Sequence, residues 1–524
     1  MTDRPILAVA RAASYDIGAN RKGATTGATW SLLLPSLPLG RIAVLGVPDP
    51  ASRERIEEVA KTTVDGATGD DKFDMIWLAP GGHHPAPDRA TLRAGLTEHG
   101  LIVDEQPDDG AGPAAGAARF RVLRRGGDTL VAMPVAFPVV ESWLRGRGLA
   151  GPATLGPRDR LRRLALAIRR GSRPVSSPVW GFLDLIGQPG LERPPRYLRD
   201  LAATGGNDVG AHAWGLSAAG PYRTQKVLVP LFAPGALVPE IIVKLARHPS
   251  VNRRLGVELD GLRRLATAGT TIRERVPAVR FSGMHSGLLV VGESALDGIP
   301  FRAPQMQHHP LAADAVAWLT ELGDRTAARV ETGVAAAALD DLVDAYVAAD
   351  GPGRALAGEL RAQVDRIRRH RDPFPVVVQH GDPGTWNLVA MPGDRAGFLD
   401  WENHEERGMP LWDLFYLLRS LAVGSVPRRP LERRLGHVQR ALLDTSERTP
   451  FIVDAVRRYC AQVGVADDLV EPLFHLGWMF QALKEVTRLA PGRLGEGHFY
   501  ALLRRGLERR ADGTLESLFR ETRT

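Results

Sequence analysis

Three polar side chains in the carboxyl-terminal half of the chain have types and spacing that suit phosphoryl transfer. Asp382 follows a β-branched run and His380-Gly381, Asn387 lies five residues later, and Asp400 ends a second short apolar run. Phosphoryl transfer needs a base that orients a hydroxyl group, and oxygen ligands that hold magnesium on the nucleotide phosphates. We therefore predict Asp382 as the base, and Asn387 and Asp400 as the metal ligands.

A hairpin whose loop Asp and Asn residues serve only the turns is the alternative interpretation of the same residues. Turn chemistry alone does not account for all of the intervals. The interval D-x-x-x-x-N matches the kinase catalytic loop, and a carboxylate after a short strand matches the second metal-binding segment of kinases. The combination with D-W-E at 400–402 is far more specific than a lone H-G-D.

Residues 376–402 resemble the aminoglycoside phosphotransferase and choline kinase family, small-molecule relatives of protein kinases, and GMPLWDL at 408–414 continues the resemblance. It covers about residues 206–524. It implies a bilobal, protein-kinase-like α+β fold with a helix-rich C-lobe, which binds ATP or GTP between its lobes with Mg²⁺ and phosphorylates a small-molecule hydroxyl. By the same resemblance, His380 and Asp413 support the catalytic loop, although an Asp at a helix N-terminus is also favoured by the helix dipole.

An acidic cluster follows the second metal segment and is a candidate acceptor site. It consists of Glu402, Glu405 and Glu406, with His404 between them. Such a cluster could receive a cationic acceptor, such as an aminosugar or a choline-like amine. A solvated loop is the alternative interpretation.

The nucleotide lobe is predicted over residues 206–300. Lys244 lies inside an apolar strand, where a cation is costly unless it is paired. By resemblance to kinases it holds the α and β phosphates and pairs with Glu258 on the next helix; a strand-edge Lys in water is the alternative. No G-x-G-x-x-G motif occurs, so residues 216–220 with Ser217 are the best candidate phosphate segment. The resemblance also places the hinge at Glu293 to Ala295, whose backbone would bind the adenine edge.

The first 150 residues show a β-α-β-α-β order that indicates an α/β layer with a parallel sheet. We predict strands over 41–47, 73–78 and 101–103, and helices over 52–61 and 88–99 with Gly100 as a helix cap. A hairpin over 119–134 would finish this sheet. The segment 73–103 is similar to the later half of a class I methyltransferase, but Pro48-Asp49-Pro50 replaces the glycine-rich cofactor turn, and proline removes donors there. We therefore predict a shortened, Rossmann-like domain that does not catalyse methyl transfer.

Residues 151–205 are predicted as a connecting segment, because prolines interrupt the part after a basic helix at 158–170. Residues 301–524 are predicted as a helical C-lobe with the catalytic loop. Its expected helices cover 311–323, 339–349, 354–371, 411–423, 451–462, 469–489 and 499–510.

Composition describes an ordinary globular protein of 524 residues with a net charge of +7. The Arg residues are dispersed in pairs, so we expect no nucleic-acid partner. Cys460 is the single cysteine, and no apolar run is long enough for a transmembrane segment. Together with the lack of a signal-peptide pattern, these features predict a cytoplasmic protein.

The prediction is thus an ATP-dependent small-molecule phosphotransferase. Two alternatives belong to other classes: a non-catalytic nucleotide-binding or regulatory module, and an S-adenosylmethionine-dependent methyltransferase with a kinase-like accessory domain. The missing glycine loop favours the first alternative, while Lys244, Asp382, Asn387 and Asp400 together oppose it. A protein kinase is disfavoured because no A-P-E segment follows Asp400.

Overall fold

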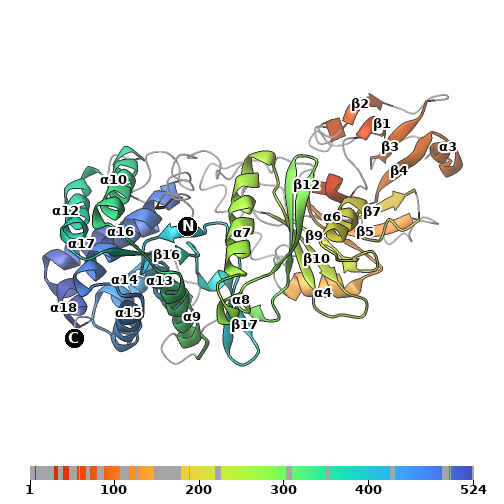
Figure 1. The fold of residues 1–524 in the computed structure, drawn as a ribbon. Coiled ribbons are helices and arrows are strands. Elements are labelled where there is room, and N and C mark those ends of the chain that lie inside the picture. Colours follow the sequence, from red (N-terminus) through yellow and green to blue (C-terminus); the bar gives the residue numbers. More distant parts are fainter. Residues whose placement is uncertain are drawn as a thin grey trace. The chain divides into compact units, whose positions relative to one another are not determined.

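The computed structural model describes most of the chain and is drawn in Figure 1. The described residues are 6–7, 29–33, 39–46, 53, 56–57, 60–65, 71–79, 88–106, 117–125, 128–146, 179–187, 189–218, 226–301, 310–349, 354–424, 431–486, 495 and 497–521. The predicted helix over 158–170 lies outside these residues, and so do positions 219 and 220 of the predicted phosphate segment.

The chain divides into two compact units. The sheet unit consists of Gly23–Leu255 and Val279–Ala295. The helical unit consists of Met1–Lys22, Gly256–Ala278 and Leu296–Thr524. This division does not follow the predicted boundaries at 150, 205 and 300, because residues on both sides of the first two boundaries share one sheet.

The sheet unit is built on a single 13-stranded sheet. Its strands run in the order β12-β13-β11-β10-β9-β6-β5-β7-β4-β3-β1-β2, and β8 pairs with β10. The strands are β1 (Leu39–Leu45), β2 (Ala60–Asp65), β3 (Phe73–Leu78), β4 (Leu96–Gln106), β5 (Ala117–Arg125), β6 (Asp128–Pro134), β7 (Val179–Ile186), β8 (Ala213–Trp214), β9 (Leu216–Ser217), β10 (Val227–Phe232), β11 (Ile241–Leu245), β12 (Val279–His285) and β13 (Leu288–Ser294). The described helices of this unit are η1 (Thr29–Leu33), α3 (Arg89–Ala94), α4 (Pro138–Gly146), α6 (Arg196–Thr204) and η2 (Pro249–Val251).

Strands β1 to β4 form the parallel part of the sheet, with β1 between β2 and β3 and with β4 on β3. Two predicted helices are shorter than expected. Strand β2 already begins at Ala60, and α3 ends at Gly95, because Leu96 pairs with Phe73 in the sheet. Gly100 therefore lies inside β4 and not at a helix end; a Cβ there would lie 2.8 Å from the Phe73 carbonyl oxygen.

The hairpin β5–β6 does not close the sheet, contrary to the prediction. β5 pairs with β7, which lies within the predicted connecting segment and also pairs with β4. β6 pairs with β9, the strand that leads into the predicted phosphate segment. The parallel strands, the hairpin and the predicted nucleotide strands therefore share one sheet, and the Rossmann-like interpretation of the first 150 residues is not confirmed as a separate domain.

The helical unit contains two three-stranded sheets and most of the helices. One sheet has the order β14 (Ile299–Pro300), β17 (Leu388–Met391), β18 (Arg395–Phe398); the other has the order β15 (Ala328–Val330), β16 (Phe374–Gln379), β19 (Glu405–Gly408). The helices are α8 (Thr270–Arg273), α9 (Pro310–Thr326), α10 (Thr332–Ala349), α12 (Ala357–Arg369), η3 (Thr385–Asn387), α13 (Trp412–Gly424), α14 (Leu431–Leu443), α15 (Thr449–Val463), α16 (Asp467–Val486), α17 (His498–Ala511) and α18 (Thr514–Glu521). Helices α10, α12, α16 and α17 pack against one another (Figure 1).

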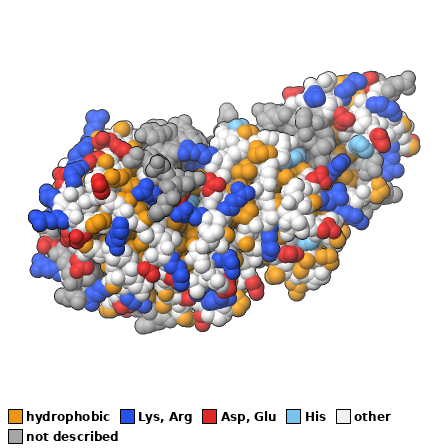
Figure 2. Space-filling model, viewed as in Figure 1, with side chains coloured by type: hydrophobic (Ala, Val, Ile, Leu, Met, Phe, Trp, Pro, Cys, Tyr) orange, Lys and Arg blue, Asp and Glu red, His pale blue; other side chains and the backbone are white. Residues whose placement is uncertain are grey.

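Helix α7 (Asn252–Leu265) crosses the boundary between the units along the chain. Figure 2 shows Lys and Arg side chains interspersed with Asp and Glu over the visible face, as the dispersed Arg pairs predict. Among the described residues, no helix is both long and apolar enough to cross a membrane.

Candidate active site

The predicted catalytic loop begins where the buried strand β16 ends. All six residues of β16 are buried between β15 and β19, which sets the direction in which the chain leaves the sheet. Gly381 then adopts φ +79°, and a Cβ at this position would lie 2.2 Å from the Asn403 carbonyl oxygen. Only glycine tolerates both the positive φ and this close approach. The turn that presents Asp382 is therefore fixed by backbone packing.

The carboxylate of Asp413, on the first turn of α13, holds the backbone of this loop. Its two oxygens accept hydrogen bonds from His380 N at 2.6 Å and Gly381 N at 3.0 Å. Lys484 of α16 donates from Nζ to the Gly381 carbonyl at 2.9 Å. Burial raises the pKa of Asp413, although His380, the two backbone bonds and Lys484 favour the charged form. The loop is thus tied to two helices of the helical unit.

His380 uses both of its ring nitrogens within the loop. Nε2 donates to the Leu399 carbonyl at 2.9 Å, and Nδ1 accepts from Asp382 N at 3.3 Å. The ring is fully buried and packs on Trp401, with ring centroids 4.4 Å apart. A ring with both nitrogens engaged cannot take a proton from an acceptor, so this geometry suits a scaffold and not a base.

Asp382 combines a secured backbone with a carboxylate oxygen that has no partner. Its carbonyl accepts hydrogen bonds from Gly384 N at 2.8 Å and Asn387 Nδ2 at 2.9 Å. Its Oδ1 is buried and has no hydrogen-bond partner among the described residues. A buried carboxylate oxygen is costly to leave unsatisfied, and such exceptions are typical of sites that bind a ligand or do chemistry.

A β-hairpin places Leu399, the residue before Asp400, opposite Asn387. In the β17–β18 pair Leu388 lies opposite Phe398, and Leu399 N donates to the Asn387 carbonyl at 2.9 Å. The two predicted metal ligands are therefore at the open end of one hairpin, although thirteen residues separate them in sequence. Asp400 adopts φ +67°, which is uncommon for a residue with a side chain and occurs at functional turns.

Trp386 is a large aromatic side chain that the loop leaves exposed, with 54% of its surface accessible. It stands between Asp382 and Asn387 in the loop, and its ring edge contacts Tyr416 of α13 at a centroid distance of 6.0 Å. A Cβ on Gly384 would lie 2.3 Å from the Trp386 ring, so this glycine makes room for the indole. The pose of the ring is thus defined by its neighbours, while about half of the residue remains accessible.

Lys244 and Glu293 form a buried ion pair in the sheet unit. Lys244 Nζ lies 2.5 Å from Glu293 Oε1, and both side chains are almost inaccessible. Glu258, the predicted partner of Lys244, belongs to the helical unit, where its Oε1 accepts from Trp401 N at 3.1 Å. The Lys244–Glu258 pair stays a prediction.

The remaining predicted nucleotide residues are part of the sheet. Ser217 is buried in β9 and lies opposite Leu228 of β10 on one side and Val131 of β6 on the other. Ala295 N donates to the Glu240 carbonyl at 2.9 Å, so this amide is already engaged. A hinge contact through Ala295 would therefore use its carbonyl.

The acidic cluster is divided among different environments. Glu405 is buried in β19, and Glu406 forms an ion pair with Arg264 of α7 at 2.6 Å. Glu402 is partly exposed and lies two residues after Asp400. These surroundings give Glu405 and Glu406 structural roles, and an acceptor contact by the cluster stays a prediction.

Sequence reasoning missed several residues that surround the predicted ones. Lys484 carried a usable signal, because it is a lone cation in an otherwise apolar stretch of α16, as Lys244 is in β11. Glu293 was considered for its backbone alone. Ser420, whose Oγ accepts from Thr385 N at 3.1 Å, had no signal in the sequence pattern.

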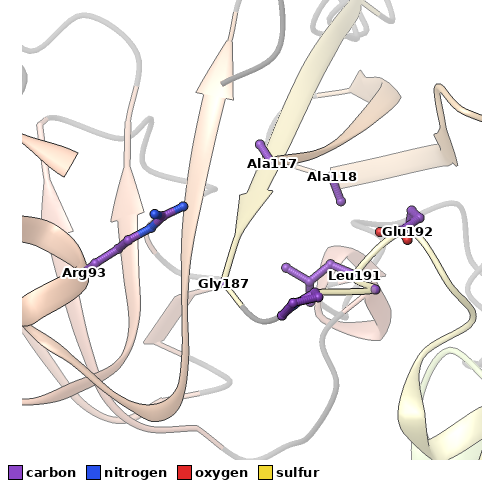
Figure 3. Close-up of a pocket in the computed structure, with 8 residues that line it drawn as sticks. Arg93, Ala117, Ala118, Gly187, Leu191 and Glu192 are labelled. Atoms are coloured by element: carbon purple, nitrogen blue, oxygen red, sulfur yellow. The ribbon is translucent and has the colours of Figure 1, made fainter. Parts of the chain in front are cut away.

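A cavity of about 630 Å³ lies elsewhere in the sheet unit. Figure 3 shows Arg93 of α3 on one side and Ala117, Ala118, Leu191 and Glu192 on the other. It lies toward the start of β4, since α3 precedes β4 and β7 runs antiparallel to it. Ligands of Rossmann-like sheets bind at the carboxyl ends of the strands, so this cavity does not support a methyltransferase site. The segments after β1, β3 and β4 lie mostly outside the described residues.

Comparison with protein families finds a match, which includes the predicted catalytic loop. Residues 234–449, less than half of the chain, match the phosphotransferase enzyme family. No curated protein matches the chain.

Solved structures similar to the chain include three kinases. A choline/ethanolamine kinase family protein from Mesorhizobium loti is 17% identical, with 57% of this chain and 89% of that chain covered and a TM-score of 0.31. An aminoglycoside phosphotransferase from Streptomyces rimosus, in complex with ADP and streptomycin, is 18% identical, with 55% of this chain and 97% of that chain covered and a TM-score of 0.34. A choline kinase from Streptococcus pneumoniae is 13% identical, with 55% of this chain and 90% of that chain covered and a TM-score of 0.31.

The family match decides the enzyme class, and the low TM-scores of the solved structures assign no role to individual residues. Residues 234–449 contain a phosphotransferase-family domain, and the predicted class, a small-molecule kinase that acts on a hydroxyl group, is confirmed.

Proposed function

We propose that this protein transfers the γ-phosphate of ATP or GTP to a hydroxyl group of a small molecule, with Asp382 as the base. The acceptor oxygen attacks the γ-phosphorus in line, the bond from that phosphorus to the β-phosphate oxygen breaks, and the nucleoside diphosphate leaves. The hydroxyl proton passes to a carboxylate oxygen of Asp382.

The observation that carries this proposal is the buried, unpartnered Oδ1 of Asp382. The backbone around it is held by Asp413, Asn387 and the ring of His380. The carboxylate is therefore pre-oriented by groups other than its own oxygens. A positioned acceptor hydroxyl would satisfy Oδ1 and donate its proton to it, which is the geometry that a general base requires.

The residues at the open end of the β17–β18 hairpin fit a magnesium ion. Asn387 donates from Nδ2 to Asp382, so its Oδ1 remains as an acceptor, and Asp400 adds a carboxylate. Hard oxygen donors suit Mg²⁺, which keeps waters and takes substrate phosphates to complete its shell. When bound, the ion would neutralise charge on the nucleotide phosphates.

Lys244 is the proposed phosphate-binding cation of the sheet unit. In the structure its charge is balanced by Glu293 inside the sheet, as a buried ammonium group requires. We propose that Lys244 also contacts the α and β phosphates of the nucleotide, with Glu258 as the second carboxylate. Ser217 is proposed to act through the position of β9, because its side chain is buried.

The proposal is tested by measuring release of ADP or GDP in the presence of Mg²⁺. The full chain is compared with Asp382→Asn, without an acceptor and with aminoglycosides, choline, amino alcohols and sugars. The acceptor-free arm measures transfer to water and does not depend on the choice of panel. We expect acceptor-dependent release that falls by at least about 10²-fold in the variant, since removing a general base typically costs about 10²–10⁴-fold.

A matched control is Asp394→Asn, which makes the same chemical change in the exposed turn of the same hairpin, at the end away from Asn387 and Asp400. It should retain activity. Retention of turnover by Asp382→Asn would overturn the role of Asp382. Nucleotide binding with no release to water or to any acceptor would favour a non-catalytic module, and absence of nucleotide binding would refute the proposal as a whole.

A further inference from the structure

The predicted nucleotide strands of the sheet unit are joined along β9 to a part of the chain that precedes the predicted nucleotide lobe at 206–300. Strands β12, β13, β11, β10 and β9 form one end of the sheet, and β9 then pairs with β6. Ser217 lies opposite Val131, Leu216 lies opposite Ala132, and Ala218 N donates to the Leu130 carbonyl at 2.6 Å. An edge that would otherwise be open is therefore covered by the β5–β6 hairpin.

Both faces of the sheet continue their apolar packing across this junction. On one face Phe120 of β5 contacts Trp214 of β8 edge to face, with ring centroids 5.8 Å apart. On the other face Trp143 of α4 contacts Phe232 of β10 in the same manner at 6.0 Å. A Cβ on Gly215 would lie 2.5 Å from Val140 of α4, so the segment between β8 and β9 is pressed directly on that helix. The hairpin and the nucleotide strands therefore pack as one body.

Arg247 connects the end of β9 to the end of β11. It lies two residues beyond Leu245, the last residue of β11, and three beyond Lys244. Its guanidinium group is buried and donates from Nη2 to the Ala218 carbonyl at 2.5 Å. Ala218 directly follows β9, and its backbone N donates to the Leu130 carbonyl of the hairpin. The end of β9 is thus fixed by one contact from the hairpin and one from the segment that follows β11, the strand that carries Lys244.

We propose that the β5–β6 hairpin is a working part of the nucleotide-binding lobe, and that Arg247 is a positioning residue that fixes the end of β9 relative to Lys244 for nucleotide binding. This inference rests on the proposed function. A buried guanidinium group is costly unless its donors are satisfied, and a backbone carbonyl at the end of a strand makes it a rigid link. Because Lys244 and the end of β9 are held by the same short segment, loss of Arg247 should weaken nucleotide binding more than it weakens the fold.

The test measures Mg·ADP and Mg·GDP affinity of the full chain by calorimetry, together with the melting temperature. Arg247→Met keeps the length and apolar stem of the side chain but removes the donors, and Arg247→Lys is a milder change. The matched control is Arg366→Met on α12, a partly buried Arg of the helical unit whose partner is Glu471 at 2.7 Å and not β9. We expect about tenfold weaker diphosphate binding in Arg247→Met, a smaller loss in Arg247→Lys, and unchanged affinity in the control even if its melting temperature falls.

In turnover the same variants should raise KM for the nucleotide and leave KM for the acceptor unchanged. Equal nucleotide affinities for the Arg247 variants and the native chain would overturn the positioning role and leave Arg247 with a structural one. If neither variant folds, hydrogen exchange on the native chain decides, because Mg·ADP should slow exchange in β6 and leave β2 unchanged. Absence of that protection would overturn the inference, whereas a native chain that binds no nucleotide would instead refute the proposed function on which it rests.

Discussion

Replacement of Asp413 by Asn should separate activity from stability. The carboxylate accepts two backbone hydrogen bonds, at 2.6 Å from His380 and 3.0 Å from Gly381. Hydrogen bonds to a charged group contribute about 1.5–3 kcal/mol each, against about 1 kcal/mol for a neutral pair. Asn keeps one acceptor and turns its own NH₂ group toward the second N–H, so the loop loses about 2–4 kcal/mol of restraint.

The expected result is a fall in kcat of about 10²-fold or more, since each 1.36 kcal/mol in the barrier is about tenfold in rate. Nucleotide affinity should change far less, because Asp413 holds the backbone of the loop that carries the proposed base, Asp382, and has no proposed contact with the nucleotide phosphates. The assay is acceptor-dependent ADP release at saturating nucleotide. Asp454→Asn on the exposed face of α15 makes the same chemical change and is the control. A kcat within threefold of the native value would refute the reasoning.

The stability of the same variant should depend on pH in a defined direction. Burial raises the pKa of Asp413 above its ordinary value of 3.8, so the folded chain holds this proton more tightly than the unfolded chain does. The native stability therefore declines as pH rises from 3.8 through the folded pKa, relative to a variant that cannot ionise. Unfolding by denaturant at several pH values should show that the free energy of unfolding of Asp413→Asn rises relative to that of the native chain across that window. The opposite trend would contradict a desolvation cost for the charged Asp413 carboxylate.

Two further predictions concern the acceptor and the helical core. Trp386→Ala should raise KM for the acceptor about tenfold with little change in KM for the nucleotide, because an exposed aromatic side chain in the loop of the proposed base can stack on a substrate. Equal acceptor KM values of the variant and the native chain in steady-state kinetics would exclude that contact. His475 is fully buried in α16 near Arg366 and Arg510, and its pKa is lowered from 6.5 to about 3, chiefly by burial. Below pH 6.5 the unfolded chain binds this proton and the folded chain does not, so the native free energy of unfolding should fall by about 1.4 kcal/mol per pH unit. His475→Gln should show a shallower decline in denaturant midpoints between pH 7 and 5.5, and an unchanged slope would remove His475 as its source.

The proposed catalytic residues could be predicted from the sequence because their spacing along the chain is local. The interval from Asp382 to Asn387 is a single loop, and one short hairpin returns the chain to Asp400. Seven helices of the helical unit were also predicted from their apolar period, although α10 begins seven residues before its predicted start, and α8, α14 and α18 were not predicted. The positions of Lys484 and Glu293 were not predictable to the same degree, because a side chain that reaches another element leaves no interval to count.

The strand order of the large sheet could not be predicted from local sequence patterns. β9 has two residues and therefore no alternation of apolar and polar positions, so nothing in its sequence marks it as a strand or chooses its neighbour. Its partner β6 lies more than 80 residues earlier, and β7 was obscured by the prolines on either side of it. The predicted boundary at 205 followed the start of the family resemblance, which reports shared chemistry and not shared packing.

That boundary separates residues that the fold keeps together. A chain beginning at 206 would lack Leu130, Val131 and Ala132, and would leave the backbone of β9 without its partner strand. It would also expose Trp214 and Phe232, whose aromatic partners belong to β5 and α4. The segment before 206 therefore completes the lobe that carries Lys244, and its place in the sheet accounts for its presence without requiring a second catalytic activity.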